Sequence, residues 1–291
     1  MYLATVTCNR DFQQMLLQAE SIQRFLNPCK HVIIINESHP DLDFWIRWLQ
    51  PYYTNHELVI IPRIDYAYPT NSLGTRDRYG GVDGVSSGWR SQQLQKMLLA
   101  YKFEDDYLLL DSKNFFIKPT DINEWEDSIG SGNFLKYGAE HSLCGTYTKY
   151  SELFEKDIAY YTKPCTPFKV KREPLVSKCK VGELGYKLFY PEHHIIPASE
   201  GIFYSFFIED EINQLVDIPF VKSLTIWGDD KPNFAKKLFE MIAEPDIKVA
   251  GLHREILSTM TKQDVKIVDF WLNYTLNFVN KIYPMPRDSH V

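Results

Sequence analysis

Short apolar runs alternate with amphipathic stretches in residues 1–119, and this alternation is the feature that most constrains the fold. The predicted strands are 1–7, 30–37 and 56–63, and the predicted helices between them are 11–26 and 41–53. Strands that alternate with helices pair in parallel, because right-handed crossovers bring successive strands to the same sheet. We therefore predict an α/β fold with an open mixed, mostly parallel sheet flanked by helices.

The rest of the chain continues this pattern less regularly. A helix at 89–103 should turn Leu94, Met97, Leu98 and Tyr101 inward, with Arg90, Gln93 and Lys96 on or near another face. The preceding segment, 69–88, is rich in glycine and serine and is predicted to be a mobile loop. We predict strands or extended segments at 105–119, 130–138, 175–191 and 247–256, and helices at 150–163, 197–211 and 262–283. In the helix at 197–211, Ser199 is expected to be the N-cap and Glu200 to lie in the first turn.

Composition narrows the classes of partner and compartment. A net charge of −6 with scattered basic residues argues against a nucleic-acid partner, because such binding depends on neutralising phosphates. No apolar stretch reaches the roughly 18 residues that a membrane span needs. The 5 cysteines lack metal-ligand spacing and are expected to be free thiols. These features predict a cytoplasmic protein.

The apolar run at 107–110 ends at Asp111, which Ser112 and Lys113 follow. Open α/β sheets bind ligands at the carboxyl ends of their strands, and the strands at 1–7 and 30–37 should reach the same edge. A carboxylate there can hold a ribose hydroxyl or a hard cation such as Mg²⁺ or Mn²⁺. The alternative is an aspartate that only closes a turn.

Two adjacent segments resemble a known family. The segment DDYLLLDSKNFFIKP at 105–119 looks like the strand and Asp-any-Asp motif of GT-A glycosyltransferases, which an apolar pair and a proline follow. Together with SGWRSQQLQKMLLA at 87–100 it is similar to a little-characterised bacterial and viral family of GT-A-like proteins. The likeness extends thinly to ATVTCNRDF, SEGIFYS and GLHRE. It implies one GT-A-like domain over 1–291, with a nucleotide-binding half at 1–120 and an acceptor-binding half with the C-terminal helix at 121–291.

The resemblance also implies an activity and a set of site residues. The enzyme would move a sugar from a UDP- or GDP-linked donor to a hydroxyl of a glycan or other acceptor, as hexosyltransferases do. Glu200 matches the catalytic base of inverting members, and Asp111 with His253 would hold a metal ion, Mn²⁺ or Mg²⁺. The implied donor-binding residues are Thr5, Thr7, Arg10, Asn36, Trp89, Arg90, Gln93, Lys96, Asp111 and Ser112. A purely structural role remains an alternative for two of these residues: His253 as a loop histidine, and Glu200 as a first-turn carboxylate that complements the helix dipole.

Lys113 departs from the family pattern, because it stands where the second aspartate is usual. An ammonium ion does not coordinate a cation and repels one over several ångströms. Either a metal binds through Asp111, His253 and the diphosphate alone, or Lys113 replaces it and stabilises the leaving diphosphate as a catalytic group. In a third arrangement Lys113 points away, although Asp111 and Lys113 share a face if the strand continues. We favour weak or absent metal binding.

Two other functions stay open. A nucleotidyltransferase would normally carry a glycine-rich phosphate loop after its first strand, and TVTCNRDFQQ contains no glycine. A nucleotide-sugar-binding protein of the same fold, with catalysis impaired by Lys113, is the other alternative.

Overall fold

The computed structural model describes residues 1–65, 87–125, 134–136, 144–162, 166–194, 196, 198–210, 212, 222–226 and 233–253. Most of the predicted loop at 69–88 and all of the predicted helix at 262–283 lie outside these residues. None of the helices within the described ranges is long and apolar enough to cross a bilayer.

A five-stranded sheet forms the centre of the protein, with the strand order β3-β2-β1-β4-β8. The strands are β1 (Tyr2–Thr7), β2 (Lys30–Ile35), β3 (Glu57–Pro62), β4 (Tyr107–Asp111) and β8 (Phe168–Val170). The first four are parallel to one another, and β8 pairs antiparallel with β4. This confirms the predicted α/β class and the open, mostly parallel sheet.

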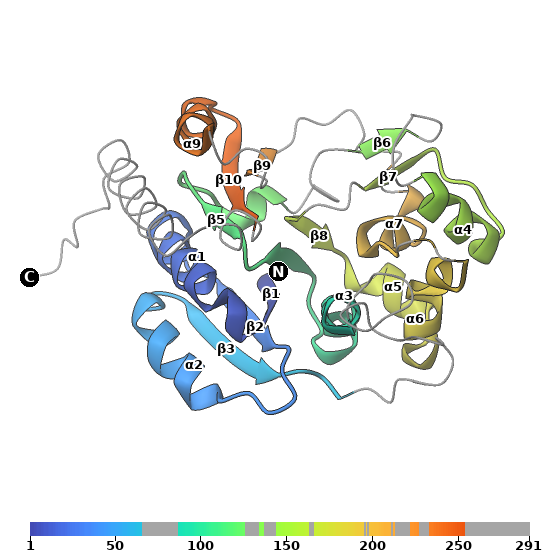
Figure 1. The fold of residues 1–291 in the computed structure, drawn as a ribbon, viewed down its shortest axis with the longest axis horizontal. Coiled ribbons are helices and arrows are strands. Elements are labelled where there is room, and N and C mark those ends of the chain that lie inside the picture. Colours follow the sequence, from blue (N-terminus) through green and yellow to red (C-terminus); the bar gives the residue numbers. More distant parts are fainter. Residues whose placement is uncertain are drawn as a thin grey trace, which may run out of the picture.

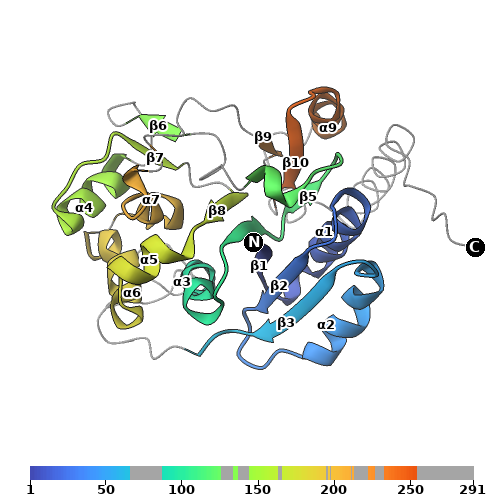
Figure 2. The same cartoon turned by 180° about the vertical axis from the view of Figure 1, so that it is seen from behind.

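Helices cover both faces of this sheet (Figures 1 and 2). One face carries α1 (Phe12–Phe25) and α2 (Leu42–Leu49), and the other carries α3 (Ser87–Lys102), α5 (Arg172–Lys178) and α6 (Val181–Leu188). Alternate strand residues enter the two cores: Leu3 and Leu108 pack on the α1 side, whereas Ala4 and Leu109 pack on the α3 side. Burial on both faces explains why these strands read as continuous apolar runs.

The remaining elements lie beyond β4. In a three-stranded sheet, β10 (Ile247–Leu252) pairs antiparallel with β5 (Asn114–Phe116) and parallel with β9 (Lys222–Ile226). The other elements are β6 (Phe134–Lys136), β7 (Tyr160–Thr162), α4 (Cys144–Phe154), α7 (Glu200–Ser205) and α9 (Phe234–Ala243). Because β8 and β10 follow residue 121, strands from both predicted halves pair with each other.

Four short 3-10 helices complete the described chain. They are η1 (Asn9–Asp11), η2 (Gln50–Tyr52), η3 (Ile122–Trp125) and η4 (Tyr190–His194). The α-helix α2 ends at Leu49, and Gln50–Tyr52 continues it as a 3-10 turn that contains Pro51.

Three sequence predictions differ from the structure. The prediction of a strand or extended segment at 175–191 is wrong, because most of these residues form the end of α5, all of α6 and the start of η4. Its buried residues Leu175 and Cys179, then Leu184 and Leu188, recur at helical spacing, which its valines obscured. The run at 105–119 divides into β4 and β5, and the helix predicted at 150–163 ends at Phe154, before β7.

Candidate functional site

The candidate site lies where β4 ends beside β1. Asp111 is the last residue of β4 and aligns with Val6 of β1. It shares its face with Leu109, so its side chain points to the α3 side, and Ser112 turns to the α1 side. The turn at Ser112 and Lys113 then leads into β5, so one short segment presents polar groups to both sides of the sheet.

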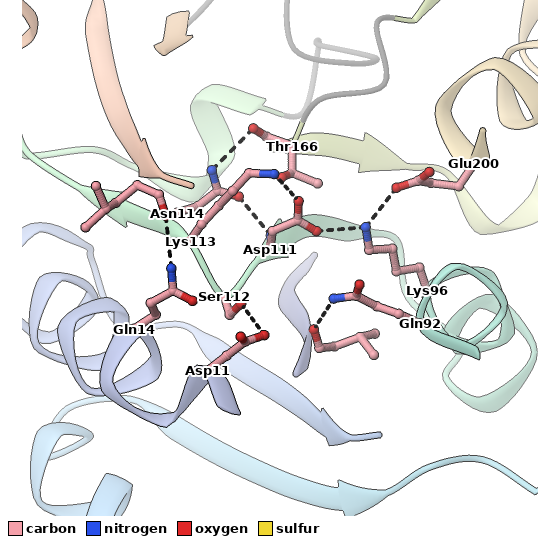
Figure 3. A network of polar contacts seen from close by, with 12 residues as sticks. Asp11, Gln14, Gln92, Lys96, Asp111, Ser112, Lys113, Asn114, Thr166 and Glu200 are labelled. Carbon is pink, nitrogen blue, oxygen red and sulfur yellow. Dashed lines mark hydrogen bonds and ion pairs between the residues drawn. The ribbon is translucent and has the colours of Figure 1, made fainter. Parts of the chain in front are cut away.

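Four charged side chains form a continuous chain on the α3 side (Figure 3). The Lys113 Nζ atom lies 2.7 Å from Asp111 Oδ2, and Lys96 Nζ lies 2.7 Å from Asp111 Oδ1. Lys96 Nζ also lies 2.8 Å from Glu200 Oε1 at the start of α7. The two side chains thus lie on the same side of the sheet, but the turn at Ser112 and Lys113 brings them together, because the strand that the prediction required to continue ends at Asp111.

The cluster keeps Asp111 and Lys96 ionised although burial opposes both charges. Burial alone raises the pKa of Asp111, but Lys113 and Lys96 outweigh it and hold this pKa well below its usual range. Burial likewise opposes the charge on Lys96, yet Asp111 and Glu200 raise the pKa of Lys96 above its usual value. Because the two cations balance the two carboxylates, the cluster is electrically neutral as it stands.

Exposure separates the groups that a ligand can reach from those that support them. The Lys113 and Asp111 side chains are 18% and 17% exposed, whereas Lys96 is 3% exposed. Glu200 lies between them at 10%. A ligand at this edge therefore contacts Lys113 and Asp111 first, and the buried Lys96 supports Asp111 from the core side.

Helix α3 places Lys96 by attaching its first turns to three strand ends. Ser91 Oγ donates to Asn36 Oδ1 at 2.6 Å beyond β2, and Gln92 Nε2 donates to the Val6 carbonyl at 3.1 Å in β1. The Gln95 amide both accepts from and donates to the backbone of Ile64 beyond β3, at 2.7 and 3.0 Å. These hydrogen bonds explain the polar sequence of a helix that the core surrounds.

Arg90, Gln93 and Lys96 were expected on or near another face from the apolar residues of this helix, yet all three are buried. The Arg90 guanidinium pairs with Glu192 of η4 at 2.5 Å. The Gln93 Oε1 atom is buried and has no hydrogen-bond partner within the described part of the chain. Trp89 is partly buried and packs against the core on the α3 side.

The other predicted donor contacts lie around this cluster in different ways. The backbone N–H of Asn36 donates to the Thr7 carbonyl at 2.7 Å, and this bond joins the ends of β1 and β2. The Thr7 hydroxyl is buried without a partner among the described residues, and Arg10 is exposed in η1. Thr5 is fully buried, and its hydroxyl contacts Gln18 and His31 behind the edge. Their roles in donor binding stay predictions.

His253 comes close to the acidic segment through the backbone. It follows β10, and the Leu252 amide donates to the Lys113 carbonyl at 2.9 Å. No local pattern in the sequence predicts this contact, because the two segments lie far apart along the chain. Gly251 in β10 allows the close packing of β10 on β9, because a Cβ atom there would lie 2.5 Å from Thr225 Oγ1.

The donor set fits a divalent cation poorly. Each oxygen of Asp111 already lies against an ammonium ion. Within the described ranges, no group of three or more His, Cys, Asp or Glu side chains is arranged to hold a metal ion. Mn²⁺ and Mg²⁺ prefer several oxygen ligands, and this arrangement does not supply them. Metal binding by Asp111 and His253 stays a prediction.

Several polar residues that support the site were not predicted. They are Asp11, Gln14, Gln18, Gln92, Asn114 and Glu192. Asp11 accepts from the Ser112 hydroxyl at 3.0 Å, and Asn114 Oδ1 accepts from the Asp111 amide at 2.8 Å. Gln14 and Gln18 are spaced four residues apart beside the apolar stripe of α1. That spacing was the one local signal of a buried amide pair.

No protein-family model matches the chain, and no curated protein matches its sequence. Three solved structures align with it over most of its length. Apo mouse xyloside xylosyltransferase 1 aligns over 86% of this chain and 96% of its own, at a TM-score of 0.49 and 8% identity. Galactosyltransferase LgtC, in complex with donor and acceptor sugar analogs, aligns over 93% and 96%, at 0.49 and 9%. The apo glycosyltransferase GlyE of Streptococcus pneumoniae TIGR4 aligns over 100% and 66%, at 0.48 and 12%. Each TM-score is below 0.5, so the site is interpreted from this chain's own residues.

Proposed function

We propose that the protein is a glycosyltransferase that moves a sugar from a nucleoside-diphosphate donor to a hydroxyl group of an acceptor. The observation that carries the proposal is the pairing of Lys113 with Asp111 at the carboxyl end of β4, 2.7 Å apart and partly exposed. The likeness of 86–119 to GT-A glycosyltransferases supports the same function.

Lys113 is the group best placed to meet the diphosphate of the donor. It is the more exposed of the two cations, and an ammonium ion is a good point-charge partner for phosphate. When the diphosphate binds, it competes with Asp111 for Lys113, and Asp111 keeps Lys96 as a counter-ion. Asp111 is then free to accept a hydrogen bond from a ribose hydroxyl through the oxygen that Lys113 leaves.

Glu200 is the proposed base. Lys96 orients its carboxylate through Oε1, and none of the described residues pairs with Oε2, which is the oxygen that takes the proton. The acceptor oxygen attacks the anomeric carbon as its proton passes to Glu200. The bond from that carbon to the diphosphate oxygen breaks, and the nucleoside diphosphate leaves with the electron pair, stabilised by Lys113. Attack opposite the leaving group inverts the anomeric configuration.

Nucleotide binding is tested by thermal shift with UDP and GDP, each with and without Mn²⁺. A ligand at a hundred times its dissociation constant stabilises a protein by about 2.7 kcal/mol, which raises the melting temperature measurably. We expect a shift with one of the two nucleotides that does not require Mn²⁺. No shift with either nucleotide, with or without Mn²⁺, contradicts the proposal.

Catalysis is tested by nucleotide release from a panel of donor sugars. Glu200→Gln keeps the hydrogen bond to Lys96 but removes the base, so we expect release to fall about 100-fold or more with nucleotide binding retained. Unimpaired release by this variant removes Glu200 from the role of base. Lys113→Asp should restore the usual acidic pair, so we expect it to raise the dependence of nucleotide binding on Mn²⁺.

The close Lys113–Asp111 pair also supports a second candidate, a protein that binds a nucleotide sugar without transferring it. Such a protein would give the thermal shift, but wild type would release no nucleotide from any donor in the presence of acceptors. The two assays together therefore separate the enzyme from the binding protein.

A further inference from the structure

A second polar network lies behind the charged cluster, on the α1 side of the sheet, and the proposed reaction does not use it. It joins Tyr53, after η2, to His31 of β2, Thr5 of β1 and Gln18 of α1. Thr5, His31 and Gln18 are 0% exposed and Tyr53 is 2% exposed. Unlike the charged cluster, all of its groups are neutral side chains or backbone carbonyls.

The Gln18 amide can have one orientation. Its Nε2 atom lies 2.9 Å from the Asp111 carbonyl and 2.8 Å from the Asn114 carbonyl. Carbonyl oxygens accept and do not donate, so the amide nitrogen with its two protons must face them. The Oε1 atom of Gln18 therefore faces the Thr5 hydroxyl at 2.9 Å.

This orientation fixes the direction of every other hydrogen bond. Gln18 Oε1 carries no proton, so the Thr5 hydroxyl donates its single proton to it. The His31 Nε2 atom, 2.9 Å from Thr5 Oγ1, must then donate to that oxygen. Burial lowers the pKa of His31 to about 3, so the ring is neutral and its Nδ1 atom has no proton. The Tyr53 hydroxyl consequently donates to Nδ1 at 2.6 Å.

We propose that Tyr53, His31, Thr5 and Gln18 form a directional hydrogen-bond relay whose role is to position the Asp111–Asn114 turn, and with it the Asp111–Lys113 pair. The relay ends on the two carbonyl groups that bracket this turn. These four are positioning residues, because Gln18 contacts Asp111 only at its backbone carbonyl and none of the four touches the charged side chains of the cluster. The functional part of the inference rests on the proposed nucleotide site.

Other contacts of α1 reinforce the same turn. Ser21 Oγ accepts from the Phe116 amide at 3.0 Å in β5, and Gln14 Nε2 donates to the Leu252 carbonyl at 2.9 Å. With the Gln18 contact to Asn114, one face of α1 therefore fixes both ends of β5 and the strand end before His253. A chain of buried hydrogen bonds is strengthened by its neighbours, and breaking one member leaves another unpaired without access to water.

The test compares two substitutions at Thr5. Thr5→Val removes the hydroxyl and keeps the shape, whereas Thr5→Ser keeps the hydroxyl and removes a packed methyl group. If Thr5 acts only by packing, serine is the more disruptive, because it leaves a small cavity. The relay predicts the reverse order. Two spectroscopic signals report on it: the backbone amide resonances of Ser112, Lys113 and Asn114, and the ring nitrogen resonances of His31.

We expect wild type to show His31 protonated at Nε2 alone. Thr5→Val should shift or broaden the three turn resonances and weaken UDP or GDP binding about 10-fold, and Thr5→Ser should stay closer to wild type in both. Gln18→Leu should resemble Thr5→Val. Gln13→Leu is the matched control on the same helix, because Gln13 is exposed and faces away from the relay.

Either of two results overturns the inference. One is a His31 ring protonated at Nδ1, and the other is a Thr5→Val spectrum whose turn resonances match wild type. Both are read without substrate, so they decide the relay even if the protein binds no nucleotide and the proposed function fails. If Gln18→Leu does not fold, the Thr5 pair still decides.

Discussion

The two sides of the sheet hold the same turn, Asp111–Asn114, by different interactions. On the α3 side, Asp111 is held by Lys96 and Lys113 through ion pairs of 2.7 Å. On the α1 side, the backbone of the same turn is held by the neutral amide of Gln18 at 2.9 and 2.8 Å. The charged side is the more exposed and has groups that a phosphate can recruit. The neutral side is sealed and has every proton committed.

This division shows how side chains that exchange partners on ligand binding can lie on a turn whose backbone is held in place. Ion pairs are strong but have little directional preference, so a bound anion can exchange one partner for another at small cost. When a hydrogen bond between neutral buried groups breaks, the unpaired groups bear the full cost of desolvation, because water does not reach them. Such bonds therefore resist rearrangement. The predictions below break each side in turn.

The largest effect is expected from Lys96→Met. This change leaves Glu200 without its counter-ion and one oxygen of Asp111 without its cation, both largely buried. Removing one partner from a buried ion pair costs about 3–5 kcal/mol of unfolding free energy. Urea unfolding measures the loss. Lys102→Met, at an exposed position of the same helix, is the control. A loss for Lys96→Met no greater than that of the control would show that the cluster is not coupled to folding.

Acid should break the neutral side next. The His31 pKa falls from 6.5 to about 3 in the folded protein, because burial and nearby His56 oppose its charge. Between these values the unfolded chain binds a proton that the folded protein does not, so stability falls as the pH is lowered. We expect a loss of about 2 kcal/mol between pH 7 and pH 5 from this group.

Urea unfolding at a series of pH values checks this loss. His31→Asn should flatten the dependence of stability on pH in that interval, although His56, whose pKa burial also lowers, contributes a remainder. His39→Asn, at an exposed position, should leave the dependence unchanged. An equally steep dependence in His31→Asn would mean that His31 is protonated in the folded protein.

A smaller effect is expected where α7 presents Glu200 to the charged side. The Ser199 side chain accepts from the Ile202 amide at 3.4 Å and caps this helix. Ser199→Ala should cost about 1 kcal/mol of unfolding free energy, the usual value for a lost N-cap. Ser177→Ala is the control, since that hydroxyl is exposed and bonds a carbonyl within α5. Equal effects of the two changes would remove the capping role.

The smallest effect should come from an ion pair away from both sides. Lys149 Nζ lies 2.7 Å from Glu152 Oε2 on α4, with the two side chains 21% and 47% exposed. Lys149→Gln should cost less than about 0.5 kcal/mol, because water screens exposed pairs. Its thermal unfolding beside that of Lys96→Met isolates the contribution of burial. A loss comparable to that of Lys96→Met would contradict the assignment of the large effect to burial.

The sequence predicted the class of fold and the location of the acidic segment, because both depend on local periodicity. Apolar runs such as 107–110 can be strands without reference to distant residues, and Ser199 followed by Glu200 marks a helix start by itself. Prediction was poor where the local signal is ambiguous. The segment 175–191 carries apolar residues compatible with either period, and packing selected the helices.

What the sequence determined by itself was an alternation of strands and helices and an apolar strand whose carboxyl end carries Asp111. Only the tertiary structure decided that Lys96 lies between Asp111 and a glutamate 104 residues further on, and that Gln18 reaches a carbonyl 93 residues away. The physical reason is that these contacts depend on how whole elements pack. A side chain's partner across the sheet is set by the position of the helix that bears it, and no local pattern in the chain records that position.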